Sequence, residues 1–164
     1  MMVGELKLQS IGTIRSPFRE RKGMPIQPVG ARGIRGTVEV LPEFEKGLQD
    51  LEGFSHIYLL YWFHLSEGFD LTVKPFMDSE YHGVFATRAP RRPNQIGLSV
   101  VRLVAIKGNK LTVEDIDILD GTPLLDIKPF VPEFDIFGRQ FRAGWLEKQA
   151  VSPENVKADE RFSG

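Results

Sequence analysis

The amino-acid sequence predicts an all-β fold, a mainly antiparallel, barrel-like domain with long loops and one short helix. Short runs of apolar and β-branched residues recur along the chain, separated by Gly, Pro and Asn residues, a pattern typical of strands joined by turns. Only one segment places apolar residues convincingly at helical spacing. Many short strands with frequent turns favour an antiparallel barrel or sandwich.

The first forty residues have the pattern of two strands with a long loop between them. Residues 8–16 alternate apolar and polar side chains and end before a proline, which stops a strand. Residues 17–35 are rich in Pro, Gly and basic side chains and show no periodicity. An irregular loop of this length is usually functional. Residues 36–42 then predict the second strand.

One short helix is expected at residues 42–54. Pro42 is suited to the first turn of a helix, and acidic side chains follow it. Apolar residues then recur at helical spacing from Phe44 to Leu51. We expect the helix to end at Gly53.

The remaining strands follow in three groups. Residues 55–66 are too apolar for a half-exposed strand, so we expect this segment to be buried on both faces. Residues 71–76 and 81–87 have the composition of short strands. Residues 97–131 form the longest strand-rich stretch, and the Lys-Gly-Asn triplet at 107–109 indicates a hairpin within it.

The 164 residues of the chain are enough for one domain with a buried core. We expect residues 1–145 to form the β-barrel domain and residues 146–164 to be a polar C-terminal tail. The most apolar stretch is much shorter than the roughly 20 residues that span a bilayer. The chain begins without a signal-peptide pattern. We therefore expect a cytoplasmic protein that does not associate with membranes.

Composition excludes several kinds of chemistry. The chain has no cysteine, which excludes disulfides, thiolate metal sites and cysteine nucleophiles. His56 and His64 flank the apolar stretch and would lie roughly 26 Å apart at ~3.3 Å per residue, too far for one metal ion. His82 has no ligand-like neighbour, so we expect no metal. The common nucleotide-binding and hydrolase motifs are absent from the sequence.

Residues 86–103, ATRAPRRPNQIGLSVVRL, contain four arginines and no acid. For Arg102, pairing across a hairpin with the acidic stretch that follows is an equally good explanation. Arg88, Arg91 and Arg92 stand near Pro90 and Pro93, which interrupt the hydrogen-bonded ladder between paired strands. These prolines also lower the entropy lost on binding. Because guanidinium groups bind phosphate and stack on bases, these arginines and the basic loop from Arg15 to Arg35 suggest an RNA-sized polyanion.

Three charged residues fall close together in LDGTPLLDIKPF, namely Asp120, Asp126 and Lys128. The Asp-Gly-Thr-Pro sequence has strong turn chemistry, because Asp bonds its own backbone and Gly allows positive φ. The same charges stand beside apolar residues, where partly buried charges need partners. They are either turn residues or ligands for an amine or a ribose hydroxyl.

Four segments of the chain carry a more specific signal: IGTIRSPF, LQDLEGFSHIYLLYWFH, GVFATRAPRRPNQIGLSVVRL and LDGTPLLDIKPF. In this order and spacing, from Ile11 to Phe130, they resemble the TsaA-like family of tRNA methyltransferases. The resemblance implies a barrel domain that binds S-adenosyl-L-methionine and forms a homodimer with the cofactor near the subunit interface. It also implies methylation of N6 of threonylcarbamoyl-adenosine next to the anticodon of a tRNA.

The resemblance further implies which residues contact ligands. Cofactor-binding positions are Gln27, Pro28, Val29, Gly30, His64, Leu65, Arg88, Leu98, Glu114, Asp115, Ile116 and Asp117. Substrate- or RNA-binding positions are expected at Arg15, Arg91, Arg92, Asn94, Thr122 and Lys128. Arg91 and Arg92 would hold phosphate or the threonyl carboxylate. Asp126 or Asp120 is expected to be the catalytic carboxylate that takes or holds the N6 proton.

Three features depart from the family pattern. The loop PIQPVG lacks an arginine that the family often has, Gln95 replaces a usual proline, and the chain stops soon after Trp145. The last of these departures leaves open which tRNA, or which modified nucleoside, is the substrate. An alternative is a non-catalytic module that binds S-adenosyl-L-methionine or RNA. A pure RNA-binding β-domain should expose aromatic side chains for stacking, whereas the aromatic residues here lie mostly in apolar runs, so the enzyme is favoured.

Overall fold

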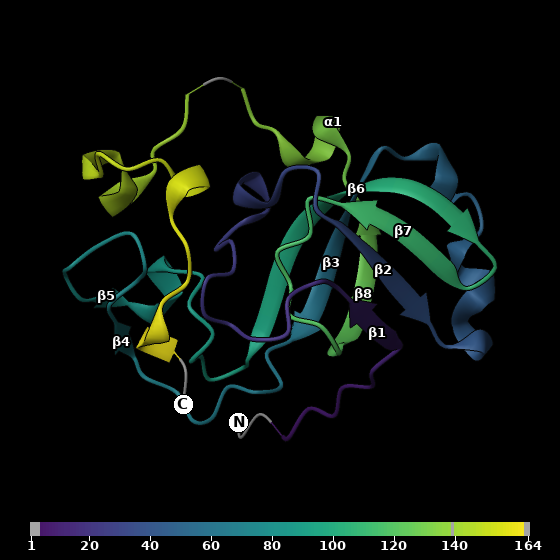
Figure 1. Ribbon diagram of the computed structural model, residues 1–164, viewed down its shortest axis with the longest axis horizontal. Helices are drawn as coiled ribbons and strands as arrows, with labels where there is room; N and C mark the ends of the chain where they lie inside the picture. The colour runs from purple at the N-terminus through teal and green to yellow at the C-terminus, as the bar shows by residue number, and fades with distance from the viewer. Residues whose placement is uncertain (1–3, 139, 163–164) are drawn as a thin grey trace.

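The computed structural model describes residues 4–138 and 140–162, in which six antiparallel strands close into a barrel (Figure 1). The order around the barrel is β1-β2-β7-β6-β3-β8. The strands are β1 (Gly12–Arg15), β2 (Arg35–Val40), β3 (His56–Trp62), β6 (Ile96–Lys107), β7 (Lys110–Glu114) and β8 (Thr122–Pro129). The predicted all-β, antiparallel barrel is therefore confirmed.

Pairing between the first and last strands closes the barrel. Gly12 of β1 stands opposite Val40 of β2 on one side and Leu124 of β8 on the other. A Cβ on Gly12 would lie 2.3 Å from the carbonyl oxygen of Glu39, so this close approach requires glycine. The predicted Lys-Gly-Asn turn joins β6 to β7, with Gly108 at a φ of 57°.

Strand β3 is buried on one face only, so the prediction of burial on both faces was wrong. Ile57, Leu59 and Tyr61 are buried, whereas the alternate residues are half-buried and Trp62 is exposed. A closed barrel has a single interior, which each strand reaches with every second side chain. The rest of the barrel core consists of Ile14, Val38, Val40, Leu48, Val101, Leu111, Val113, Ile116, Ile118 and Leu124.

The predicted helix forms two short 3₁₀ helices instead of one continuous helix. They span Pro42–Leu48 and Leu51–Gly53. Asp50 lies between them at a φ of 67°, a left-handed conformation that interrupts a right-handed helix. Among the described residues, the one α-helix is α1 (Pro132–Asp135), which follows β8.

A second, two-stranded sheet lies beside the barrel and consists of β4 (Thr72–Val73) and β5 (His82–Gly83). Both strands are shorter than predicted. The expected second strand continues as the 3₁₀ helix Val84–Ala86. The remaining 3₁₀ helices span Pro28–Ala31, Gly144–Lys148, Pro153–Asn155 and Glu160–Phe162.

The described part of the C-terminal segment packs on the long loop before β2. The amide of Gly23 donates to the carbonyl of Ala158 at 2.8 Å, and the amide of Ala158 donates to Met24 at 2.8 Å. Phe162 is 8% exposed and packs in a small apolar cluster with Val73, Val84, Ala89 and Phe76. Figure 1 shows this yellow segment beside β4 and β5, away from most of the barrel. No helix among the described residues is long and apolar enough to cross a membrane.

Candidate functional site

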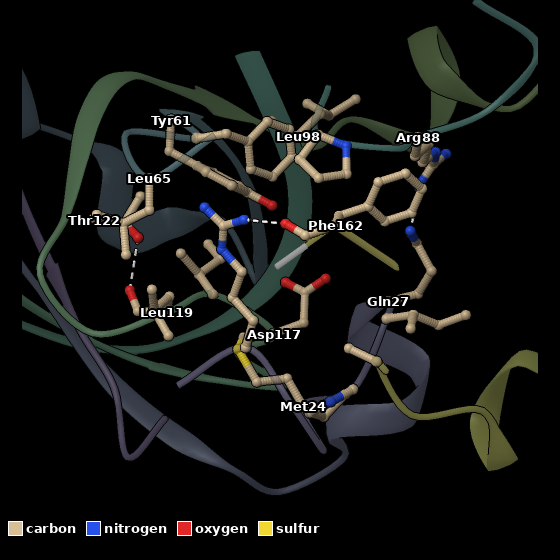
Figure 2. Close-up of a pocket in the computed structure, with 18 of the residues that line it drawn as sticks. Met24, Gln27, Tyr61, Leu65, Arg88, Leu98, Asp117, Leu119, Thr122 and Phe162 are labelled. Atoms are coloured by element: carbon tan, nitrogen blue, oxygen red, sulfur yellow. Dashed lines mark hydrogen bonds between the residues drawn. The ribbon is translucent and has the colours of Figure 1, made fainter. Parts of the chain in front are cut away.

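A cavity of about 320 Å³ opens at the end of the barrel where β3 finishes and where β6 and β8 begin. Loop 21–27 and the C-terminal segment complete its wall (Figure 2). Most of the wall is apolar and includes Met24, Phe63 and Leu98. Its volume falls within the range of small-molecule sites, roughly 300–1,000 Å³.

A hydrogen-bonded chain of three side chains reaches this cavity. Ser99 donates to the Asp117 carboxylate at 2.6 Å, so the Tyr61 hydroxyl, 3.0 Å from Ser99 Oγ, is the donor in its bond to Ser99. A Cβ on Gly97 would lie 2.2 Å from the Tyr61 ring, so glycine leaves the space that the ring fills. The Asp117 carboxylate points into the cavity (Figure 2).

The environment of Asp117 favours its neutral form. Burial raises the pKa of the Asp117 carboxyl to about 7, against the lowering effects of the Ser99 hydrogen bond and the Arg88 charge. Burial, with the nearby Asp117 charge, also raises the pKa of the Tyr61 phenol. The cavity therefore holds a carboxyl group that exchanges its proton near neutral pH.

The arginine-rich turn contributes two guanidinium groups with different partners. Arg88 donates to the side-chain oxygen of Gln27 at 2.7 Å and lines the cavity (Figure 2). Arg92 also lines it, but its Nη1 is held by three backbone carbonyls, those of Val84 at 3.0 Å, Thr87 at 2.8 Å and Ala89 at 3.3 Å. Arg92 thus fixes the turn that presents Arg88.

The C-terminal segment forms part of the cavity wall. Ala158, Asp159 and Phe162 line it. Arg21 donates to the carbonyl oxygen of Phe162, and the Phe162 ring packs edge-on against Phe76 with centroids 5.1 Å apart. Loop 21–27 and the C-terminal segment therefore meet at the cavity wall.

The structure gathers eight of the predicted ligand-binding residues around this cavity. They are Gln27, His64, Leu65, Arg88, Arg92, Leu98, Asp117 and Thr122. They come from four separate parts of the sequence, which the barrel end brings together. Their assignment to cofactor or substrate stays a prediction.

Neither predicted catalytic aspartate is among the residues that line the cavity. Asp120 accepts the Ser16 amide at 3.1 Å and also accepts a bond from Arg19, so it fixes the start of the basic loop. Asp126 is 45% exposed on β8 and pairs with Lys128 at 2.9 Å. Their chemical surroundings are those of structural and surface ion pairs.

Other predicted residues also lie outside the cavity wall. Glu114 accepts bonds from Arg35 and Arg102, which hold its pKa below the usual range. The cross-hairpin pairing considered for Arg102 is therefore present. Asp115 has a φ of 67° and accepts the Gly33 amide at 2.8 Å. The other predicted residues outside the wall are Arg15, Pro28, Val29, Gly30, Arg91, Asn94, Ile116 and Lys128.

Sequence reasoning missed several residues of the site. Tyr61 and Ser99 lie in apolar strand patterns, where they are indistinguishable from core residues until the register is known. Met24, Arg21 and Phe162 meet through loop and C-terminal packing, which no local pattern encodes. Among the described residues, no group of three or more His, Cys, Asp or Glu side chains could hold a metal ion.

A closed β-barrel with a mixed apolar and charged cavity at one end defines a small-molecule-binding barrel domain. A family model described as the tRNA-methyltransferase O N-terminal domain matches residues 13–136. The chain belongs to this family, so the resemblance found in the sequence is confirmed.

Two curated relatives illustrate the range of the family. The chain is 60% identical over 152 residues to a probable S-adenosyl-L-methionine-binding protein of Pyrococcus abyssi, covering 93% of this chain and 82% of that protein. It is 34% identical over 139 residues to the tRNA (adenine(37)-N6)-methyltransferase of Mus musculus, covering 80% of this chain and 32% of that protein.

A solved structure shares the fold. The crystal structure of TrmO from Pseudomonas aeruginosa matches with a TM-score of 0.73 and 43% sequence identity, over 87% of this chain. This chain spans 63% of that one. The C-terminal segment after residue 136 lies outside the family match.

Proposed function

We propose that this protein is an S-adenosyl-L-methionine-dependent methyltransferase that acts on N6 of threonylcarbamoyl-adenosine next to the anticodon of a tRNA. The observation that carries the proposal is the cavity at the barrel end, where Asp117 and Arg88 face a mainly apolar space in a member of this family. The names of the Pyrococcus and mouse relatives support the cofactor and the reaction.

The residues of the cavity fit the proposed methyl donor. S-adenosyl-L-methionine combines a cationic sulfur and an amino-acid end with an apolar adenine face. Leu98, Phe63 and Met24 provide apolar surface, and Arg88 can pair with a carboxylate. A mixed set of this kind matches a ligand with a charged end and an apolar body.

The bound donor would supply a methyl group on a positively charged sulfur: the carbon–sulfur bond breaks as the nitrogen–carbon bond forms, and N6 loses a proton. In-line displacement needs positioning more than covalent help, so the cavity wall would orient both reactants. We propose Asp117, rather than Asp120 or Asp126, as the proton acceptor, because it lines the cavity and has a pKa of about 7. Ser99 holds its carboxylate in place.

Label transfer from S-adenosyl-L-methionine to bulk tRNA, with and without the threonylcarbamoyl group, tests the proposed function. Methylation of modified tRNA alone supports it and makes the modification part of recognition. Donor binding by calorimetry without label transfer to either tRNA would favour the alternative, a non-catalytic binding module.

The homodimer and the cytoplasmic location also belong to the proposal. The run after β8 supports self-association, because Phe134 is 72%, Ile136 52%, Phe137 77% and Phe141 66% exposed. Four large exposed apolar side chains so close in sequence favour an interaction surface. A second copy of the chain would remove them from water.

A further inference from the structure

A second cavity, about 730 Å³ in volume, lies next to the first. Its wall comes from the loop between β4 and β5, from the turn 84–89 and from the C-terminal residues 145–153. None of the functions described so far uses this space. Its C-terminal wall lies outside the region that the family match covers.

The two cavities share part of their walls. Six residues line both, namely Ile26, Gln27, Phe76, Thr87, Arg88 and Phe162. A methyl donor and its acceptor atom must approach to about 3–3.5 Å before transfer. An acceptor base must therefore bind directly beside the donor cavity, and the six shared lining residues place the second cavity there.

The lining of the second cavity suits a nucleobase. Phe85, Trp145 and Met77 provide flat or polarisable surface, and Arg88 is the one charged residue among those that line it. Bases stack on aromatic side chains without needing a charged partner. A more open depression that shares Arg21, Leu65 and Leu119 with the donor cavity is otherwise lined by charged residues, namely Arg19, Glu20, Lys22 and Glu160. Charged walls of this kind suit phosphates rather than a base.

Trp145 is held in place before any ligand binds. Its ring stacks on His82 with centroids 4.5 Å apart and an interplanar angle of 17°. Its indole N–H donates to the Ala86 carbonyl at 2.8 Å, and His82 in turn bonds Asp78 at 2.8 Å. A fixed aromatic wall reduces the entropy lost on binding.

We propose that the second cavity binds the acceptor adenine base, with Trp145 and Phe85 as its aromatic walls and N6 directed past Arg88 into the first cavity, which Asp117 lines. Gln27 and Arg88, which line both cavities, then lie where the acceptor meets the donor. The inference rests on the proposed function and deepens it, because it assigns acceptor recognition to residues 145–153.

Steady-state kinetics test this assignment. Trp145→Ala removes the stacking wall, and Val151→Trp fills the cavity from an exposed position. Both should lower kcat/KM for modified tRNA about tenfold or more, since base–aromatic stacking has that strength. Donor affinity by calorimetry should stay within about twofold of wild type. Tyr81→Ala is the matched control, because Tyr81 is an exposed aromatic residue of the same region that lines neither cavity.

Fluorescence gives a readout that does not depend on turnover. In Trp62→Phe protein, Trp145 is the single tryptophan, and an anticodon stem-loop RNA with the modified adenosine should quench it saturably. Quenching without methyl transfer would support the base site and overturn the proposed catalysis. The base site would be overturned if the wild-type protein transfers methyl groups, the Trp145→Ala variant keeps the wild-type kcat/KM, and the RNA does not quench Trp145. That outcome would leave the proposed function intact.

Discussion

Asp117 is the residue on which the proposed chemistry depends. It is a carboxyl group without an ion-pair partner among the described residues, held by Ser99 in a mainly apolar wall. Desolvation therefore governs its protonation. Its pKa of about 7 lies where a general base operates best near neutral pH.

Asp117→Asn is expected to remove the pH dependence of turnover along with most of the turnover. In wild type, kcat/KM should rise about tenfold per pH unit below pH 7 and level off above it, as Asp117 ionises. The variant should lose about 10²–10⁴-fold in kcat with near-normal donor affinity. If Asp117→Asn instead loses donor affinity, Asp117 binds the cofactor. If turnover is lost only in Asp126→Asn or Asp120→Asn, those residues become the candidates for the catalytic carboxylate again.

A thermal melt controls for misfolding of this variant. Because the folded state raises the pKa of Asp117 above its unfolded value of about 3.9, the folded protein binds this proton more tightly. The contribution of Asp117 to the free energy of unfolding therefore falls as pH rises from about 4 to 7. The Tm of the Asn variant should equal that of wild type near pH 4 and exceed it at pH 8. A folding defect would lower the Tm of the variant at both pH values.

At the level of single residues, the sequence predicted Arg88, Leu98 and Asp117 through the resemblance to the family. It did not predict Tyr61 or Phe162. The role of Tyr61 depends on Gly97 standing opposite it in the ladder, and the position of Phe162 depends on a contact with β4 and the turn after β5. Both contacts join distant parts of the chain.

Among the elements, the turn from Val84 to Ala89 shows how one side chain can organise a loop. The prolines that flank Arg91 and Arg92 were expected to stiffen this turn. The structure adds a second cause, because Arg92 caps three carbonyls of the turn and its guanidinium lies 5.9 Å from the centroid of the Phe85 ring.

Arg92→Gln is expected to loosen this turn and weaken donor binding. Removal of the guanidinium takes this donor from the partly buried carbonyls of Thr87 and Ala89, whereas the Val84 carbonyl still accepts from Thr87. A buried carbonyl that loses its donor destabilises by about 1–3 kcal/mol. Differential scanning calorimetry should show a lower Tm, and titration should show weaker donor binding. Arg91→Gln is the matched comparison, because its exposed pair with Asp70 contributes at most about 1 kcal/mol. Equal Tm values for both variants would contradict the role of Arg92.

Local patterns predicted most barrel strands but not the ends of elements. The hairpin at Gly108 followed from turn chemistry, and the segment expected to be irregular is so except for the 3₁₀ helix Pro28–Ala31 and for Arg35, which begins β2. The helix after Pro42 was mispredicted, because the left-handed conformation of Asp50 leaves no local signal. The extent of burial of β3 depended on whether the sheet closes, which is a property of all six strands together.

For the whole molecule, the exposed side chains of Phe134, Phe137 and Phe141 also correct the expectation that aromatic residues lie mostly in the core. These side chains and Phe85 are exposed. In the fold they lie outside both apolar clusters, where another molecule can cover them.

Phe137→Asp is expected to convert a dimer into a monomer, because a charge would be buried in the proposed apolar contact. Sedimentation velocity at micromolar protein concentration measures this change directly. Phe69→Asp, at an exposed aromatic position outside the run, should remain dimeric. Wild-type protein that sediments as a monomer throughout would refute the proposed assembly.

The pairing of β1 with β8 also has a consequence for how the chain reaches this structure. Gly12 pairs with Leu124, so the barrel closes only after nearly all of its strands have left the ribosome. Contacts between residues so distant in sequence slow folding, typically to about milliseconds to seconds in all-β domains. Until that closure, β1 and β8 have unpaired edges that can join strands of other chains, and the nascent protein is exposed to misassembly for that interval.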